Sequence, residues 1–179
     1  MDAIETFDSY GNSVSIYSDE DAQNPRTECD HFGHMICFHG RHNLGDEHKL
    51  SIEEALEIEE RTDVVCIALY LYDHSGITMR ASTKGNPFTC PWDSGKVGII
   101  YVTHDEIKKE YGAVDGTSIE KAAKLLLAEV QEYDQYLTGD VYGYVVTDKD
   151  GEEIDSCWGI YGLEEARKQA KEVSSPVSQ

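Results

Sequence analysis

The stretch TSIEKAAKLLLAEVQEYDQYLTG, residues 117–139, carries the longest regular pattern in the chain. Its apolar side chains recur at three- and four-residue spacing, which places them along one stripe of a helix. The stripe consists of Ile119, Ala122, Leu126, Val130, Tyr133 and Leu137. Thr117 and Glu120 have the spacing of a capping box, and Gly139 is a typical residue to end a helix. The pattern predicts one long helix whose apolar side faces a core.

Directly after this helix, the sequence changes to the alternation of a β-hairpin. The segments VYGYVVTD, residues 141–148, and EEIDSCWGIYG, residues 152–162, flank Lys149-Asp150-Gly151. Because an Asp-Gly pair between alternating apolar residues favours a tight turn, we expect two antiparallel strands here.

Upstream, three more apolar runs predict strands. VVCIALYLYD, from Val64, has little polar interruption and predicts a central strand buried on both faces, with SGITMRAS as its hairpin partner. HMICFHG, from His34, and VGIIYV, from Val97, predict two further strands.

Shorter helices are predicted from capping boxes and charge order. The boxes are Ser51 with Glu54 and Thr103 with Glu106. They predict helices at 52–61 and from Thr103 to a left-handed cap at Gly112, and LEEARKQAKEV predicts a last helix at 163–173.

Because strands come in neighbouring pairs and helices interrupt them irregularly, we expect an α+β fold, with a mainly antiparallel sheet packed by one long helix and two or three shorter helices. We expect this fold to form a single domain that spans residues 31–173. A polar, loosely ordered segment over 1–30 precedes it, and a frayed tail over 174–179 follows.

The net charge of the chain limits the classes of molecule that it can bind. The 179 residues include 35 acidic and 15 basic side chains, which gives a net charge of −20. Coulomb repulsion makes phosphate backbones and anionic membranes poor direct partners, whereas basic surfaces that hold nucleic acid are attracted. The apolar runs have strand length, the amino terminus has no signal region, and five scattered cysteines suit reduced thiols. These features favour a cytoplasmic protein.

Carboxylates gather around the long helix and the terminal hairpin, where they could imitate the phosphates of a duplex. The candidate partner-binding residues are Glu129, Glu132, Asp134, Tyr136, Asp140, Asp148, Asp150, Glu152 and Glu153. The alternative is a solvated acidic surface that serves solubility. Residues 148–153 also resemble part of a calcium loop, but the full ligand order is missing and a hairpin turn explains the pattern.

Five of the seven histidines fall between residues 29 and 48, together with two cysteines. Imidazole and thiol groups suit zinc, and the first candidate ligands are His31, His34 and His39. The spacing matches no standard zinc finger or ribbon, so we expect no cofactor and keep zinc as the alternative.

A second cluster joins Cys90, His74, Asp73 and Asp93, which lie next to predicted strand ends. A cysteine nucleophile with a histidine base and an orienting carboxylate would suit a hydrolase. The alternative, which we favour, is that these residues cap turns and anchor a loop. Motifs for dinucleotides, P-loop phosphates and the hydrolase nucleophile elbow do not occur in the sequence.

The tracts YLYDHSGIT, CPWDSGKVGIIYV, AEVQEYDQYLTGDVYGYVV and DSCWGIYG together resemble an uncharacterised family of acidic proteins carried by bacteriophages, plasmids and integrated elements. The likeness spans about residues 34–162 and brings no established activity. It implies a mobile-element setting, in which small acidic proteins resemble inhibitors of host defence systems.

We therefore expect a non-enzymatic accessory protein that inhibits a host defence complex, or another nucleic-acid-binding complex, through an acidic surface that mimics DNA. The alternatives are a small hydrolase, using Cys90 and His74 or a histidine-bound metal, and a structural or regulatory protein of the element itself.

Overall fold

The computed structural model describes residues 2–175, and these form two compact units. The central unit is Pro25–Asp134, and the terminal unit combines the two ends of the chain, residues 2–24 and 135–175. The predicted α+β class is confirmed, with two antiparallel sheets in place of one. Residues 176–179 of the predicted tail lie outside the described part. Among the described residues, no helix has both the length and the apolar composition that a bilayer crossing requires.

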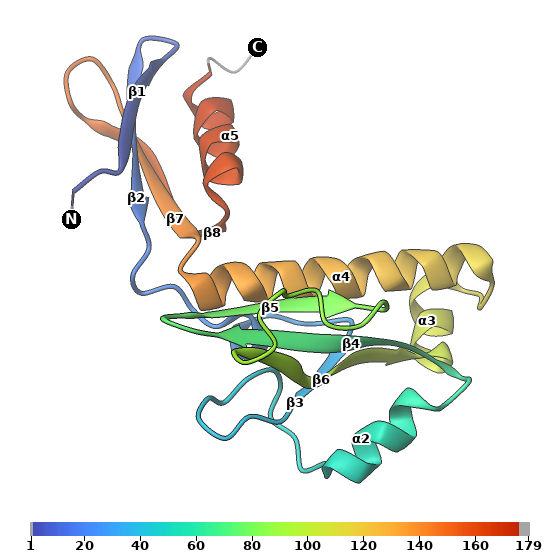
Figure 1. The fold of residues 1–179 in the computed structure, drawn as a ribbon. Coiled ribbons are helices and arrows are strands. Elements are labelled where there is room, and N and C mark those ends of the chain that lie inside the picture. Colours follow the sequence, from blue (N-terminus) through green and yellow to red (C-terminus); the bar gives the residue numbers. More distant parts are fainter. Residues whose placement is uncertain (1, 176–179) are drawn as a thin grey trace. The chain divides into compact units, whose positions relative to one another are not determined.

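The central unit is built on a four-stranded antiparallel sheet with the order β3-β6-β4-β5 (Figure 1). Its strands are β3 (His34–Cys37), β4 (Val64–Asp73), β5 (Ile77–Ser82) and β6 (Ser94–Thr103). The predicted hairpin of β4 and β5 is confirmed by continuous antiparallel pairing. Strand β4 is interior, but its burial alternates along the strand, so one face is better covered than the other.

Four helices accompany this sheet: α1 (Pro25–Glu28), α2 (Ile52–Glu59), α3 (His104–Tyr111) and α4 (Gly116–Thr138). Helix α4 runs along one face of the sheet and α2 lies on the other (Figure 1). On the α2 side, Ala55 packs in a cluster with Ile36 and Ile99, whereas the stripe of α4 buries Leu126, Val130 and Tyr133.

Both capping boxes predicted for α2 and α3 are present, and Gly112 closes α3 with a φ of 82°. The capping box predicted for the long helix is wrong. Helix α4 begins one residue earlier than Thr117, because Asp115 accepts the backbone N–H of Ser118 at 2.9 Å. A carboxylate thus satisfies an amide that the first turn leaves unpaired.

The terminal unit is a second sheet, ordered β1-β2-β7-β8, with one helix against it. Its elements are β1 (Glu5–Ser9), β2 (Asn12–Ser18), β7 (Val141–Thr147), β8 (Glu153–Tyr161) and α5 (Leu163–Ser174). Val14, Tyr144 and Val146 pack with Ala166 and Ala170 of α5. The segment that we expected to be loosely ordered therefore supplies two strands, because β2 pairs in register with the distant β7.

Candidate functional site

The topology of the central sheet brings several polar side chains to one edge. Strands β3 and β4 are both antiparallel to β6, so they run in the same direction and end where β6 begins. The loop after β3, the end of β4 and the loop before β6 therefore meet. A backbone hydrogen bond of 2.8 Å from Asp73 N–H to the Asp93 carbonyl joins two of these segments.

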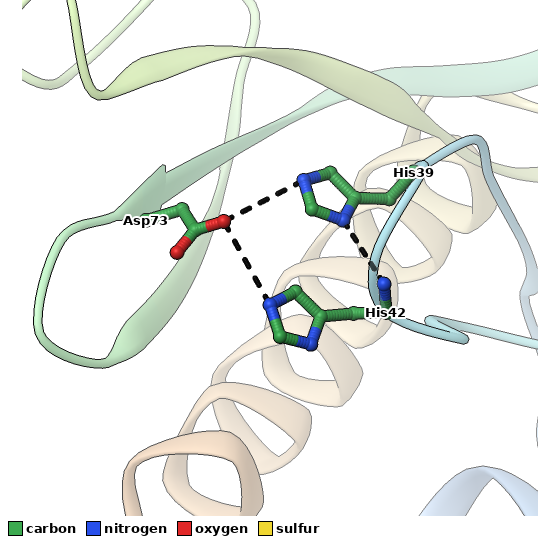
Figure 2. A group of neighbouring side chains, drawn as sticks. All are labelled: His39, His42 and Asp73. Carbon is green, nitrogen blue, oxygen red and sulfur yellow. Dashed lines mark hydrogen bonds and ion pairs between the residues drawn. The ribbon is translucent and has the colours of Figure 1, made fainter.

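Two histidines of the first loop face the last residue of β4 (Figure 2). The Nε2 atoms of His39 and His42 each lie 3.7 Å from Oδ2 of Asp73. The side chains of His39 and Asp73 are 20% exposed, and that of His42 is 39% exposed. Arg41, which projects into solvent, places Nη2 at 2.5 Å from the same oxygen. One guanidinium and two imidazole groups thus surround a single carboxylate.

The hydrogen bonds that Nδ1 of His39 accepts determine which ring nitrogen carries the proton. Nδ1 of His39 accepts the backbone N–H groups of Arg41 at 3.4 Å and of His42 at 3.2 Å. A neutral imidazole carries one proton, so an accepting Nδ1 leaves the proton on Nε2, directed at Asp73. The ring therefore holds the turn of its own loop and also donates toward the end of β4.

An open cavity of about 300 Å³ lies beside this cluster. Its lining includes His39, Arg41, Asp73, Trp92 and Asp93. A second cavity, of about 210 Å³, is lined mainly by apolar side chains of α2 and β6 together with Phe38, and also by Glu59 and Lys96. The two cavities share Phe38, Lys96 and Val97, so a polar compartment adjoins an apolar one within the central unit.

The structure brings three of the four candidate catalytic residues together, in an order that does not suit catalysis. Oδ2 of Asp93 accepts the thiol of Cys90 at 3.2 Å and lies 3.4 Å from Nδ1 of His74. The carboxylate, rather than the imidazole, is thus the partner of the thiol. Cysteine hydrolases need the base on the thiol and the carboxylate behind the base. Asp73, the fourth candidate, belongs to the His39 and His42 cluster instead.

Alkylation of the cysteines tests whether Cys90 has the reactivity of a catalytic nucleophile. Burial, with the negative charge of Asp46 as a second cause, raises the pKa of Cys37 to about 12. Burial, with Glu59 second, raises the pKa of Cys66 to about 11. At pH 8 we expect iodoacetamide to modify exposed Cys29 within minutes and to leave Cys37 and Cys66, whose thiol pKa values are raised, unmodified, as followed by mass spectrometry.

In the same experiment, Cys90 should react no faster than Cys29, because its thiol donates to a carboxylate. A Cys90 rate far above that of Cys29 would contradict this interpretation and support the hydrolase alternative.

The predicted zinc ligands are not brought together. His34 opens β3 and contacts Oε1 of Glu106 at 2.7 Å, whereas His39 lies beyond the other end of that strand. An extended strand of this length separates its ends by about 10 Å, too far for a shared ion. The Nε2 atom of His31 is buried and has no hydrogen-bond partner in the described chain. Among the described residues, the group with metal-ligand spacing is His39, His42 and Asp73.

Two of the candidate acidic residues have internal roles in the central unit. Glu129 accepts Nη1 of Arg26 at 3.0 Å and the backbone N–H of Phe32 at 2.8 Å, and its side chain is 13% exposed. Asp134 accepts the hydroxyl of Thr78 and the backbone N–H of Met79, both at 2.7 Å. These carboxylates hold the loop before β3 and strand β5 to helix α4. Their neighbour Glu132 is partly exposed.

The other six candidates belong to the terminal unit. Asp148 shapes the β7–β8 turn, because its Oδ1 accepts the backbone N–H groups of Asp150 and Glu152 at 2.8 and 3.0 Å. Asp140 accepts Nε2 of Gln135 at 3.2 Å, and Tyr136 is partly buried near the end of α4. The three remaining candidates are exposed, and we call them the turn acids. The turn acids are Asp150, Glu152 and Glu153.

The terminal sheet also carries an aromatic pair on the face opposite α5. Val14 and Ile16 point into the core with α5, so alternation sends Tyr17 to the other face. The ring of Trp158 lies directly over Gly143, where any side chain would collide with it, and its centroid is 5.9 Å from that of Tyr17. Trp158 remains 45% exposed. The sequence shows this tryptophan within the predicted hairpin segment 152–162, but no local pattern indicates its position over a glycine.

Two further residues were missed. His42 lacked a reason to be preferred among the histidines, although its H-x-x-H spacing with His39 was readable. Arg26 was not singled out, although it is a basic residue in a strongly acidic region. Comparisons with family models, with curated proteins and with solved structures gave no match. The resemblance to acidic proteins of mobile elements therefore remains an expectation from the sequence.

Proposed function

We propose that this chain is a binding protein whose terminal unit occupies the nucleic-acid-binding surface of a basic partner protein. The observation that carries the proposal is the charge of that unit. Residues 1–24 and 135–179 contain fifteen acidic and four basic side chains, a net charge of −11. The larger central unit has twenty acidic and eleven basic side chains, a net charge of −9. Negative charge is thus denser in the terminal unit.

Two of the four basic side chains of the terminal unit are paired with carboxylates. Arg167 pairs with Glu5 at 2.6 Å and also with Glu164, and Lys168 lies 3.3 Å from Glu165. The turn acids, in contrast, are exposed in the β7–β8 turn and at the start of β8, next to the exposed Lys149. A negative field of this kind accelerates encounter with a basic surface and disfavours nucleic acid and anionic membranes.

The pair of Trp158 and Tyr17 supplies apolar contact area, which charged side chains alone do not provide. Tryptophan and tyrosine bury a large area at low entropic cost and are enriched among the residues that dominate binding energy. Aromatic faces also attract the guanidinium and ammonium groups that basic proteins use to hold phosphates. An aromatic pair on the more acidic unit, with Trp158 exposed and Tyr17 partly exposed, therefore favours a protein partner over simple solubility.

The partner class that we expect is a host defence complex, since the sequence resembles acidic proteins of mobile elements. The hydrolase alternative has less support, because Cys90 contacts Asp93 and not an imidazole. Of the predicted DNA-mimic residues, Glu129 and Asp134 are engaged inside the central unit, so the proposal rests on the terminal unit.

The test begins with capture of proteins from a host lysate on the immobilised full chain, followed by identification and purification of the strongest partner. We expect a nucleic-acid-binding protein that duplex DNA displaces from the chain, with affinity that falls steeply as salt rises. Binding that neither salt nor duplex DNA weakens would contradict the proposal.

A further inference from the structure

We propose that His39, His42 and Asp73 bind a divalent metal ion of the zinc class at the edge of the central sheet. This site is separate from the surface invoked above and does not depend on the proposed function. It differs from the zinc alternative drawn from the sequence, because His42 and Asp73 replace His31 and His34 as ligands.

The donor set fits the ion. Two imidazoles and one carboxylate form a common set of protein ligands for zinc and related metals, and three such ligands leave a position for water or another small ligand. Ligand bonds of about 2.0–2.2 Å place neighbouring donors on a tetrahedral ion about 3.4 Å apart. The two histidine Nε2 atoms lie 3.7 Å from the Asp73 oxygen, which is close to that spacing without an ion to draw them in.

The donors are also placed by the fold. Asp73 ends β4, and its backbone N–H is tied to the Asp93 carbonyl at 2.8 Å. His39 follows directly on β3, two residues after its last member, and His42 is three residues further along the same loop. Both rings aim an edge nitrogen at the carboxylate (Figure 2). The cavity of about 300 Å³ beside them, lined in part by Trp92 and Ser94, gives a ligand on the open position room to bind.

Two groups must adjust when an ion binds. Arg41 supplies the positive charge that now contacts Asp73, and its 72% exposed side chain is free to move into solvent. The proton of His39 must move from Nε2 to Nδ1, because a ligating nitrogen needs its lone pair. That shift ends the contacts of 3.4 and 3.2 Å from the backbone N–H groups of Arg41 and His42, both long for hydrogen bonds.

The test uses the full chain without a histidine tag and Co²⁺ as a coloured probe, with Zn²⁺ as competitor. We expect one Co²⁺ per chain, with visible ligand-field absorption that Zn²⁺ abolishes. His42→Ala and Asp73→Asn should each weaken the affinity at least about tenfold. His34→Ala and His74→Ala, which change histidines outside the site, should bind as the wild type does.

A second readout is specific to the His39 ring. Amide exchange followed by NMR should become faster at Arg41 and His42 on metal loading, since both backbone N–H groups lose their acceptor. Three results would each overturn the proposal. The first is no stoichiometric Co²⁺ binding, and the second is wild-type affinity in the His42→Ala and Asp73→Asn variants. The third is a loss of affinity in His34→Ala as large as in those two variants. Circular dichroism of each variant confirms that lost binding does not reflect unfolding.

Discussion

Replacing Arg26 with methionine should lower the free energy of unfolding of the central unit by about 3 kcal/mol. The side chain of Arg26 is 1% exposed, and its guanidinium donates to Asp46, Glu129 and the Gly33 carbonyl at 2.7–3.0 Å. Without it, two carboxylates lose their counter-charge. The estimate is at the lower end for a buried pair, because Asp46 is 25% exposed and recovers some hydration.

The destabilisation should appear in one unit only. Backbone amide exchange of β3 and β6 reports the central unit, and the fluorescence of Trp158, in a Trp92→Phe background, reports the terminal unit. Arg61→Met is the matched control, since Arg61 forms its ion pair with Asp63 on the surface. We expect that control to leave both readouts unchanged. A stable Arg26→Met protein would show that the Arg26 network does not hold the amino-terminal loops to α4.

Reversing the turn acids should weaken binding to the captured partner about 100-fold, because three like charges then face a basic surface. The variant is Asp150→Lys with Glu152→Lys and Glu153→Lys. These side chains are exposed, and Asp148, which shapes the turn, is retained, so the fold should be intact. Equilibrium binding at fixed salt measures the loss.

The control for this variant changes the same number of charges elsewhere. Glu53, Glu57 and Glu60 are exposed residues on or next to α2 in the central unit, and their reversal to lysine also adds two charges at each position. Both variants therefore move the net charge from −20 to −14. If overall charge alone drove association, the two variants would lose affinity equally, and the terminal unit would have no special role.

Features with local causes were predictable from the sequence. The capping boxes at Ser51 and Thr103 depend on residues three positions apart, and the Gly112 cap needs only a residue that tolerates a left-handed backbone. The β7–β8 turn follows in the same way from Asp150 and Gly151. The helix α4 stripe was readable because its period repeats over six turns.

Features that depend on distant pairing were not predictable. The local sequence of β2 gives only a weak signal for a strand, and its partner β7 lies more than one hundred residues away. The terminal unit could therefore not be predicted from either segment. The cluster at His39 likewise depends on β3 and β4 ending at the same edge, which is a property of strand order. Neither arrangement leaves a signal in local spacing.

The internal roles of Glu129 and Asp134 were partly readable. Glu129 lies three residues after Leu126 and four before Tyr133, which places it beside the buried stripe of α4. A carboxylate in that position needs a buried partner, and Arg26 is that partner. The acidic surface predicted from composition was therefore broader than the set of carboxylates that remain available to a partner.

A competition titration shows whether the chain occupies the nucleic-acid-binding surface of its partner. Labelled full-length chain is bound to its purified partner, and duplex DNA is added at constant ionic strength while bound chain and bound DNA are both measured. We expect each DNA molecule that binds to release one chain, so that no species contains both. A stable ternary complex of chain, partner and duplex would contradict this expectation.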